Sequence, residues 1–219
     1  MQRKTTAVLA TLVLGGWVGR AQATTEVQRV TFVGSQAAFQ FSASTSITCA
    51  DGSGGVAAAF GFISGADSIN NSTGSPQSLS NGTFVEIDFY SNSCTGAFIS
   101  FGDGGIANSY TPVDKKLSSA AIVGSGTVQD FNSGNVFPVS LNVTFTGTAS
   151  TFQQKSNSHT KITGTKHGNL LIAHNQSANS NRAATVSGQV TIDNVTFSSL
   201  DVFFAQFFAN SSDSLSVSK

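Results

Sequence analysis

The segment Ser118–Gly147, SSAAIVGSGTVQDFNSGNVFPVSLNVTFTG, carries the clearest structural signal in this chain. In its second half large apolar residues stand at every second position, namely Val139, Leu141, Val143 and Phe145. This alternation is typical of a strand with one buried face. Small and β-branched residues fill the first half, and the Asp, Asn, Ser and Gly residues between the halves tolerate a tight turn. The segment is therefore predicted to be a β-hairpin.

Short apolar runs separated by Gly, Ser and Asn clusters continue on both sides of this hairpin. Such spacing is typical of all-β folds. We predict one domain, residues 24–219, that folds as an antiparallel β-sandwich of jelly-roll or immunoglobulin-like type with about ten or more strands. A weak internal similarity between the two halves of the domain indicates either a duplicated β-unit or a shared composition, and both alternatives stay open.

Three segments are harder to assign. Residues 65–82 and 150–182 are polar, and both are predicted to be loops or irregular segments, which makes them the places to look for function. In residues 201–208 the Phe residues fit a helical spacing as well as a strand, but their aromatic density favours a strand.

Residues 1–23 indicate export. Arg3 and Lys4 precede an apolar run that ends in the small-residue sequence 21–23, Ala-Gln-Ala. This order is typical of a secretory signal peptide that is cleaved before Thr24. The apolar run is shorter than the ~20 residues that span a bilayer, so a membrane anchor is the weaker alternative. We expect a secreted protein, periplasmic or extracellular, with no transmembrane segment in the mature chain.

The chain contains only two cysteines, Cys49 and Cys94. Because export places them where thiols are oxidised, they are predicted to form one structural disulfide. The closed loop spans 45 positions, which is worth ~4 kcal/mol of stability by the chain-entropy estimate.

Few charged residues are available to cover the surface. They make up 10% of the chain, against roughly 25% in ordinary soluble domains. Without residues 1–23 the chain holds 8 basic and 11 acidic residues, a net charge of −3. Hydroxyl and amide side chains must therefore form most of the surface, which suits contact with a polysaccharide or a cell-surface component.

Residues 131–192 differ in charge from the rest, because they hold four bases and no acid: Lys155, Lys161, Lys166 and Arg182. The same segment holds all three histidines, His159, His167 and His174. A basic lobe with titratable histidines is a weak candidate for an anionic ligand. The histidine spacing is too wide to predict a zinc site, so solvated loop side chains are the simpler interpretation. Nucleic-acid binding is not expected, because a basic patch with interleaved stacking aromatics is missing.

No catalytic constellation stands out in the sequence. There is no G-x-S-x-G motif, and both cysteines are expected to be bonded to each other. In residues 83–90 the alternation places Glu86, Asp88 and Tyr90 on one face, and a carboxylate pair is what a glycosidase requires. Exposed acids on strands more often serve solubility. We therefore predict no enzyme, no cofactor and no metal, with a glycoside hydrolase as a less favoured alternative.

The expected role is that of a surface-associated binding or structural protein, and a carbohydrate-binding module is the alternative. Such modules stack sugar rings on exposed aromatic side chains. After cleavage the chain has no Trp, so Tyr90 and Tyr110 are the candidates for stacking, beside hydrogen bonding by Asn, Thr and Ser.

The order of several short motifs resembles a group of uncharacterised exported bacterial proteins. The motifs are Cys49-Ala-Asp-Gly, Phe84-Val-Glu-Ile-Asp-Phe-Tyr, Cys94-Thr-Gly, Leu117-Ser-Ser-Ala, Leu141-Asn-Val-Thr-Phe-Thr-Gly and Arg182-Ala-Ala-Thr-Val-Ser-Gly. In that group the fifth motif tends to carry Trp where this chain has Phe145. The resemblance implies an exported β-domain with one disulfide, and it carries over no catalytic residue. The function expected from the sequence is a secreted, non-catalytic binding or structural protein.

Overall fold

The computed structural model describes residues 26–73, 77–111, 117–162 and 171–218, and within these ranges it contains strands and no helix. The predicted signal peptide, residues 1–23, lies outside the described residues. The strands are β1 (Glu26–Thr48), β2 (Gly54–Ser72), β3 (Ser78–Asn92), β4 (Phe98–Ile99), β5 (Gly102–Ala107), β6 (Tyr110–Thr111), β7 (Ser119–Asp130), β8 (Val136–Gly147), β9 (Phe152–Ile162), β10 (Leu171–Ile192), β11 (Val195–Phe197) and β12 (Asp201–Ser218).

All twelve strands belong to one antiparallel sheet. Its order is β11-β10-β12-β1-β2-β3-β5-β7-β6, with β4 paired to β3, β9 paired to β10, and β8 paired to both β7 and β10. The prediction of an antiparallel all-β fold with ten or more strands is confirmed, and so is the strand at 201–208, which is the start of β12. The sandwich topology stays a prediction.

The central hairpin forms as its sequence predicts. Strands β7 and β8 pair from Ser119 opposite Thr146 to Gln129 opposite Val136. The four alternating apolar residues of β8 are at most 3% exposed. The alternation in the sequence therefore marks the face that is buried.

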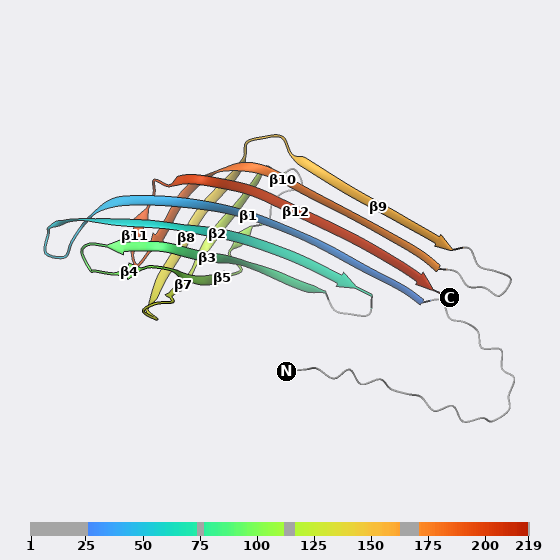
Figure 1. The fold of residues 1–219 in the computed structure, drawn as a ribbon, viewed down its shortest axis with the longest axis horizontal. Helices are drawn as coiled ribbons and strands as arrows, with labels where there is room; N and C mark the ends of the chain where they lie inside the picture. The colour runs from blue at the N-terminus through green and yellow to red at the C-terminus, as the bar shows by residue number, and fades with distance from the viewer. Residues whose placement is uncertain (1–25, 74–76, 112–116, 163–170, 219) are drawn as a thin grey trace, which may run out of the picture.

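The sheet folds over on itself and forms two layers (Figure 1). One layer contains β12, β1, β2 and β3, and the other, which lies beneath it, contains β8 and the second half of β10. Aromatic rings fill the space between the two layers. Phe145 of β8 contacts Phe39 of β1, with 5.5 Å between the ring centres, and Phe207 of β12 at 6.0 Å. All three side chains are fully buried. The first pair packs edge to face and the second is tilted, so rings from three strands join the two layers.

A β-bulge in β3 changes which face Tyr90 occupies. Gly61 of β2 pairs with Ile87, but the preceding Phe60 pairs with Phe89, so Asp88 is the extra residue. The alternation shifts by one at this point, and Tyr90 turns into the core, where it is 0% exposed, whereas Phe89 is 38% exposed. The predicted faces of residues 83–90 are therefore right before the bulge and wrong after it, because a bulge reverses the two-residue period.

The prediction of loops or irregular structure at residues 65–82 and 150–182 is wrong, because both segments consist largely of strands. Strand β2 continues to Ser72 and β3 begins at Ser78, while β9 and the first half of β10 occupy most of the second segment. Each of these polar strands pairs with its neighbour over ten or more residues. Their polar side chains stand on strands that are exposed on both faces, so the sequence shows no apolar alternation there.

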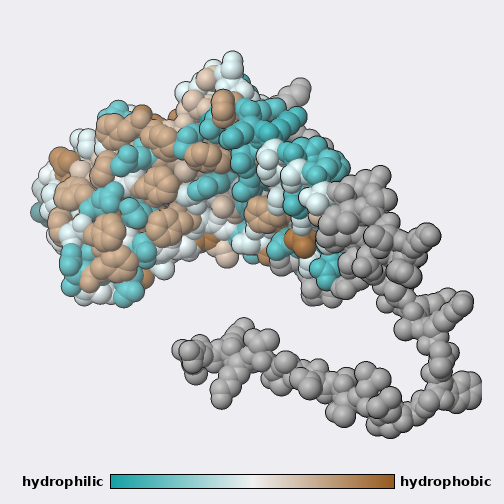
Figure 2. All heavy atoms as spheres, turned by 45° about the vertical axis from the view of Figure 1, so that its right-hand side comes forward, coloured by the Kyte–Doolittle hydropathy of each residue, from teal (hydrophilic) through white to brown (hydrophobic). Residues whose placement is uncertain are grey.

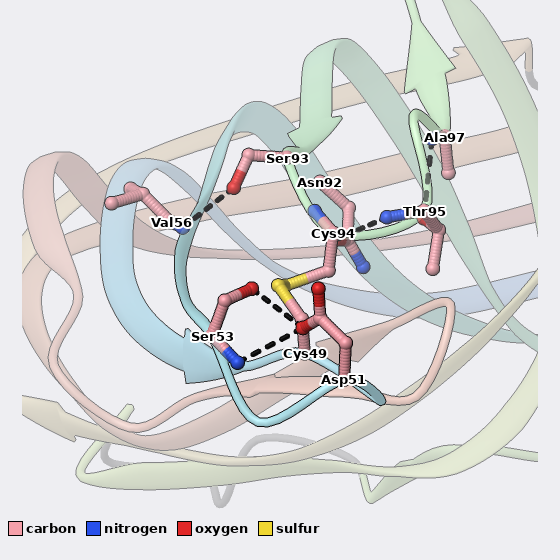
Figure 3. Close-up of a disulfide and its surroundings, with 9 residues drawn as sticks. All are labelled: Cys49, Asp51, Ser53, Val56, Asn92, Ser93, Cys94, Thr95 and Ala97. Carbon is pink, nitrogen blue, oxygen red and sulfur yellow. Dashed lines mark hydrogen bonds between the residues drawn. A yellow bond between two sulfur atoms is a disulfide. The ribbon is translucent and has the colours of Figure 1, made fainter.

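The disulfide between Cys49 and Cys94 is confirmed, with 5.1 Å between the Cα atoms. It joins the turn after β1 to the turn after β3 (Figure 3). Gly55 allows this contact, because a Cβ atom at that position would lie 2.5 Å from the sulfur of Cys94 and 3.0 Å from that of Cys49. The Ser93 hydroxyl also accepts a hydrogen bond from the backbone N–H of Val56 at 2.8 Å. The bridge thus fastens β2 and β3 at one end of the sheet.

The turn of the central hairpin is held by the buried carboxylate of Asp130, which is 2% exposed. It accepts hydrogen bonds from the backbone N–H of Ser133 at 2.8 Å and from that of Ser100 at 3.2 Å. The hydroxyl of Ser133, followed by its backbone N–H, lowers the pKa of Asp130 from 3.8 to about 2. Hydrogen bonds to a carboxylate favour its charged form.

Acid is expected to weaken the folded state through this group. Because the pKa of Asp130 is lower in the folded chain than in the unfolded one, its stabilisation is complete above about pH 4 and is lost as the pH falls towards 2. Urea unfolding between these pH values should show a steeper loss of stability in the wild type than in Asp130→Asn. Equal slopes for the two proteins would contradict this assignment.

Candidate binding groove on the sheet extension

Several strands run beyond the layer formed by β7 and β8 (Figure 1). We call this region the sheet extension; it consists of residues 26–36, 66–72, 152–162, 171–183 and 206–218. Figure 2 shows hydrophilic side chains gathered towards this end of the molecule, whereas apolar rings are scattered over the rest of the visible face. The extension is therefore the most polar part of the sheet in that view.

Two neighbouring rows of side chains cross the extension on one face. The pairing places Ser68, Gly34, Asn210, Asn179 and Gln154 in the first row. It places Ala66, Gln36, Phe208, Asn181 and Phe152 in the second row. Directly opposed residues in antiparallel strands share a face. This face is the outer one, because Ala37 and Phe39, which alternate with Gln36 in β1, point into the core.

These rows line a groove of about 510 Å³. Five carboxamides contribute to it, from Gln36, Gln154, Asn179, Asn181 and Asn210, together with the phenyl rings of Phe32, Phe152 and Phe208. Asp67 is the only titratable residue among the described lining residues. It pairs with Ser35 between the two rows, so its carboxylate lies on the opposite face, where it accepts a hydrogen bond from the Ser35 hydroxyl. The groove is thus a neutral surface that offers both hydrogen-bond donors and acceptors beside apolar rings.

Gly34 lies in the groove, where its missing side chain leaves space. A Cβ atom there would stand 2.8 Å from Oδ1 of Asn210 and 3.0 Å from the ring of Phe32. Any larger residue would displace the Asn210 carboxamide, which can rotate. Gly34 therefore leaves the room in which the Asn210 carboxamide lies.

The outer face of the sheet also carries a group of phenyl rings over the core. We call this group the outer phenylalanine patch; it consists of Phe60, Phe62, Phe84, Phe89, Phe98, Phe203 and Phe204. Phe203 is the most exposed of them, at 65%, and its ring lies 6.2 Å from that of Phe60. Phe89 and Phe98 form a second edge-to-face pair at 5.6 Å. Soluble domains rarely expose so many neighbouring apolar rings, so the patch is a candidate contact surface.

Neither of the predicted sugar-stacking tyrosines is placed to stack on a ligand. Tyr90 is fully buried, and this burial raises the pKa of its phenol. Tyr110 is 4% exposed, and its backbone N–H and C=O are hydrogen bonded to the Asn81 side chain. Both rings belong to the core, because the bulge turns Tyr90 inwards and β6 places Tyr110 beside β7.

The predicted carboxylate pair lies on β3 at the bulge. Partial burial and the nearby carboxylates of Asp88 and Asp103 raise the pKa of Glu86. Glu86 stands opposite Asp103 of β5. Like charges and burial both disfavour ionisation, and the groove described above does not include these residues.

Two of the predicted histidines lie in strands and not in a loop. His159 of β9 pairs with His174 of β10, and 4.1 Å separates the ring centres. The interpretation of separate solvated loop histidines is therefore wrong for this pair, because an antiparallel register brings distant positions together. Among the other candidates of the basic segment, His167 and Lys166 lie outside the described residues, and Lys161 lies in β9.

Arg182 is half-buried rather than part of an exposed basic surface. Its guanidinium donates to the backbone oxygens of Leu117, at 3.4 Å, and of Gly147, at 3.3 Å. The side chain thereby connects β10 to the two ends of the central hairpin.

The groove was missed in the sequence, although a signal is present. In HNQSANSNR, residues 174–182, and ANSSDS, residues 209–214, Ser and Asn recur at alternate positions. The residues between them are mostly polar as well, so no apolar alternation marks these segments as strands. The register of five strands decides which of these positions stand opposite one another. Only the tertiary structure supplies that register.

Within the described ranges no group of three or more His, Cys, Asp or Glu residues is arranged to hold a metal ion. No helix there is long and apolar enough to cross a membrane. Comparisons with protein-family models, with curated proteins and with solved structures find no match for this chain. Function must therefore be inferred from the groove and the surfaces themselves.

Proposed function

We propose that this chain is an exported, non-catalytic binding protein that holds a neutral glycan in the groove of the sheet extension. The observation that carries the proposal is the convergence of five carboxamides and three phenyl rings from β1, β9, β10 and β12 on one groove. The groove replaces the two tyrosines as the proposed sugar site.

The chemistry of the lining fits a polyhydroxylated ligand. A carboxamide has an acceptor oxygen and two N–H donors, which match the hydroxyl groups of a sugar. One N–H of Gln36 is already donated to the Ser64 hydroxyl at 2.7 Å. Phenyl rings can cover the apolar faces of the sugar ring. A volume of about 510 Å³ lies in the range of ordinary ligand sites. An anionic ligand is a poorer match, because the lining residues that the structure describes include no Lys, Arg or His.

Export and the absence of catalysis are parts of the same proposal. The charged and apolar pattern of residues 1–23 supports a secretory signal, and a disulfide is compatible with an oxidising compartment. General acid–base catalysis needs positioned titratable groups, whereas the groove is lined mainly by amides and hydroxyls.

We also retain the β-sandwich as the proposed fold type, because two layers pack on one core.

A second candidate function rests on the outer phenylalanine patch. Seven neighbouring phenyl rings on one face favour attachment to an apolar surface. In this case the protein would act as a surface-associated structural component, and the groove would be incidental.

Replacement of two groove amides is expected to weaken glycan binding. The double variant Asn179→Ala/Asn210→Ala loses two hydrogen-bonding groups that face each other in the first row, so its affinity should fall roughly 10-fold or more. Gly34→Ala should also weaken binding, because it displaces the Asn210 carboxamide. Retention on a panel of insoluble neutral polysaccharides, followed by calorimetry with the matching oligosaccharide, measures both effects.

The matched control is Asn157→Ala, which removes an amide from β9 on the opposite face and should bind like the wild type. If retention depends on Phe203 and not on Asn179 and Asn210, the surface-association candidate is favoured. A wild type that binds no member of the panel would refute the glycan proposal.

A further inference from the structure

The face of the sheet extension opposite to the groove carries a pair of imidazoles. His159 of β9 and His174 of β10 are direct partners in the antiparallel ladder. Their ring centres lie 4.1 Å apart and their planes are inclined by 75°. His159 is exposed and His174 is half-buried. Side chains alternate between the two faces of a strand. His159 is an odd number of residues from Gln154 in β9, and His174 is an odd number from Asn179 in β10, so both histidines lie on the face opposite to the groove.

We propose that His159 and His174 chelate a divalent transition-metal ion, of the class Zn²⁺, Ni²⁺ or Cu²⁺, and thereby fasten β9 to β10. Imidazole nitrogen is a preferred ligand of these ions. Two imidazoles on one ion, with nitrogens about 2.0–2.1 Å from it, have ring centres roughly 4.5 Å apart at a right angle, as in square-planar Cu²⁺ or Ni²⁺, and roughly 5.2 Å apart at the tetrahedral angle of Zn²⁺. The observed separation of 4.1 Å is shorter by roughly 0.4–1.1 Å, which a rotation of the two side chains supplies.

The acid on the neighbouring strand is held by an arginine and is not a ligand of this site. Asp213 of β12 stands one diagonal step from His174. Its carboxylate accepts two hydrogen bonds from Arg29, at 2.7 and 3.0 Å. Hydrogen bonding by Arg29 is the largest cause of the lowered pKa of Asp213, and the charge of His174 contributes. With Asp213 held by Arg29, water would complete the coordination of the ion beside the two histidines.

A bound ion would act on a strand with a single described neighbour. Among the described strands β9 pairs with β10 alone, so the ion would link the two strands through side chains as well as through the backbone. An ion that binds only the paired strands stabilises that pairing by mass action. The site does not depend on the proposed glycan function, because it lies on the opposite face.

Metal titration tests this site directly. Calorimetry of the mature protein above pH 7, where imidazole is largely neutral, should show one site, with Cu²⁺ bound more tightly than Ni²⁺ or Zn²⁺. His159→Ala and His174→Ala should each weaken Zn²⁺ binding about 10-fold or more, because each removes one of two ligands. Hydrogen exchange should also show greater protection of the β9 amides when Zn²⁺ is added to the wild type.

Two control variants keep both histidines of the pair. His167→Ala removes the third histidine of the chain, and Asn157→Ala alters the neighbouring pair on the same face. Both should bind Zn²⁺ like the wild type. Unchanged binding in either single variant of the pair, an equal loss in His167→Ala, or no binding by the wild type would each overturn the proposal.

Discussion

Replacing Phe145 by alanine is expected to lower the free energy of unfolding by about 3–5 kcal/mol, as is usual for a buried Phe. Phe145 is 0% exposed and contacts both Phe39 and Phe207. The substitution would leave a cavity between the two layers, because rings from three different strands meet at this point. Urea unfolding followed by fluorescence or circular dichroism measures the loss.

Two comparisons make this result specific to the interlayer contact. Phe145→Leu keeps most of the apolar volume and should cost clearly less than Phe145→Ala. Phe131→Ala removes a ring that is 55% exposed in the hairpin turn and that packs on the partly exposed ring of Phe101 at 5.5 Å, so its effect should stay well below that of Phe145→Ala. A Phe145→Ala protein as stable as Phe131→Ala would contradict the packing of the two layers through Phe145.

Removal of the disulfide is expected to cost about 4 kcal/mol. The bridge between Cys49 and Cys94 closes a loop of 45 positions, and the estimate reflects the freedom that the unfolded chain regains. The double variant Cys49→Ala/Cys94→Ala should therefore unfold at a markedly lower urea concentration. Since typical domains are stable by only about 5–15 kcal/mol, this loss is a large fraction of the total.

The reduced wild type is the matched control for that variant. After treatment with a thiol reductant it should unfold close to the double variant, whereas the reductant should leave the variant unchanged. Mass spectrometry after thiol alkylation checks that the oxidised wild type has no free thiol. A double variant as stable as the oxidised wild type would show that the bridge does not constrain the unfolded chain.

The parts of the fold that could be predicted are those with a local cause. The hairpin of β7 and β8 follows from an apolar period of two and from the turn residues between its strands. The pairing of Cys49 with Cys94 follows from the presence of only two cysteines and from the expected compartment. In each case neighbouring residues, or the composition alone, carry the necessary information.

The candidate site could not be predicted in the same way. Polar strands that are exposed on both faces, such as β9, have no apolar alternation and resemble loops. The bulge at Asp88 exposes Phe89 and buries Tyr90. Tyr90 is therefore not available to stack on a sugar, as the sequence-based hypothesis required. Each of these features depends on contacts with a neighbouring strand.

The sequence by itself determined the all-β class, the buried face of the central hairpin and the disulfide. The tertiary structure decided the length of the polar strands, the inward turn of Tyr90, the groove around Gly34 and Asn210, and the contact between His159 and His174. The physical reason is strand register. A local pattern sets which residues share a face of one strand, but only the hydrogen bonds between strands set which residues stand opposite one another.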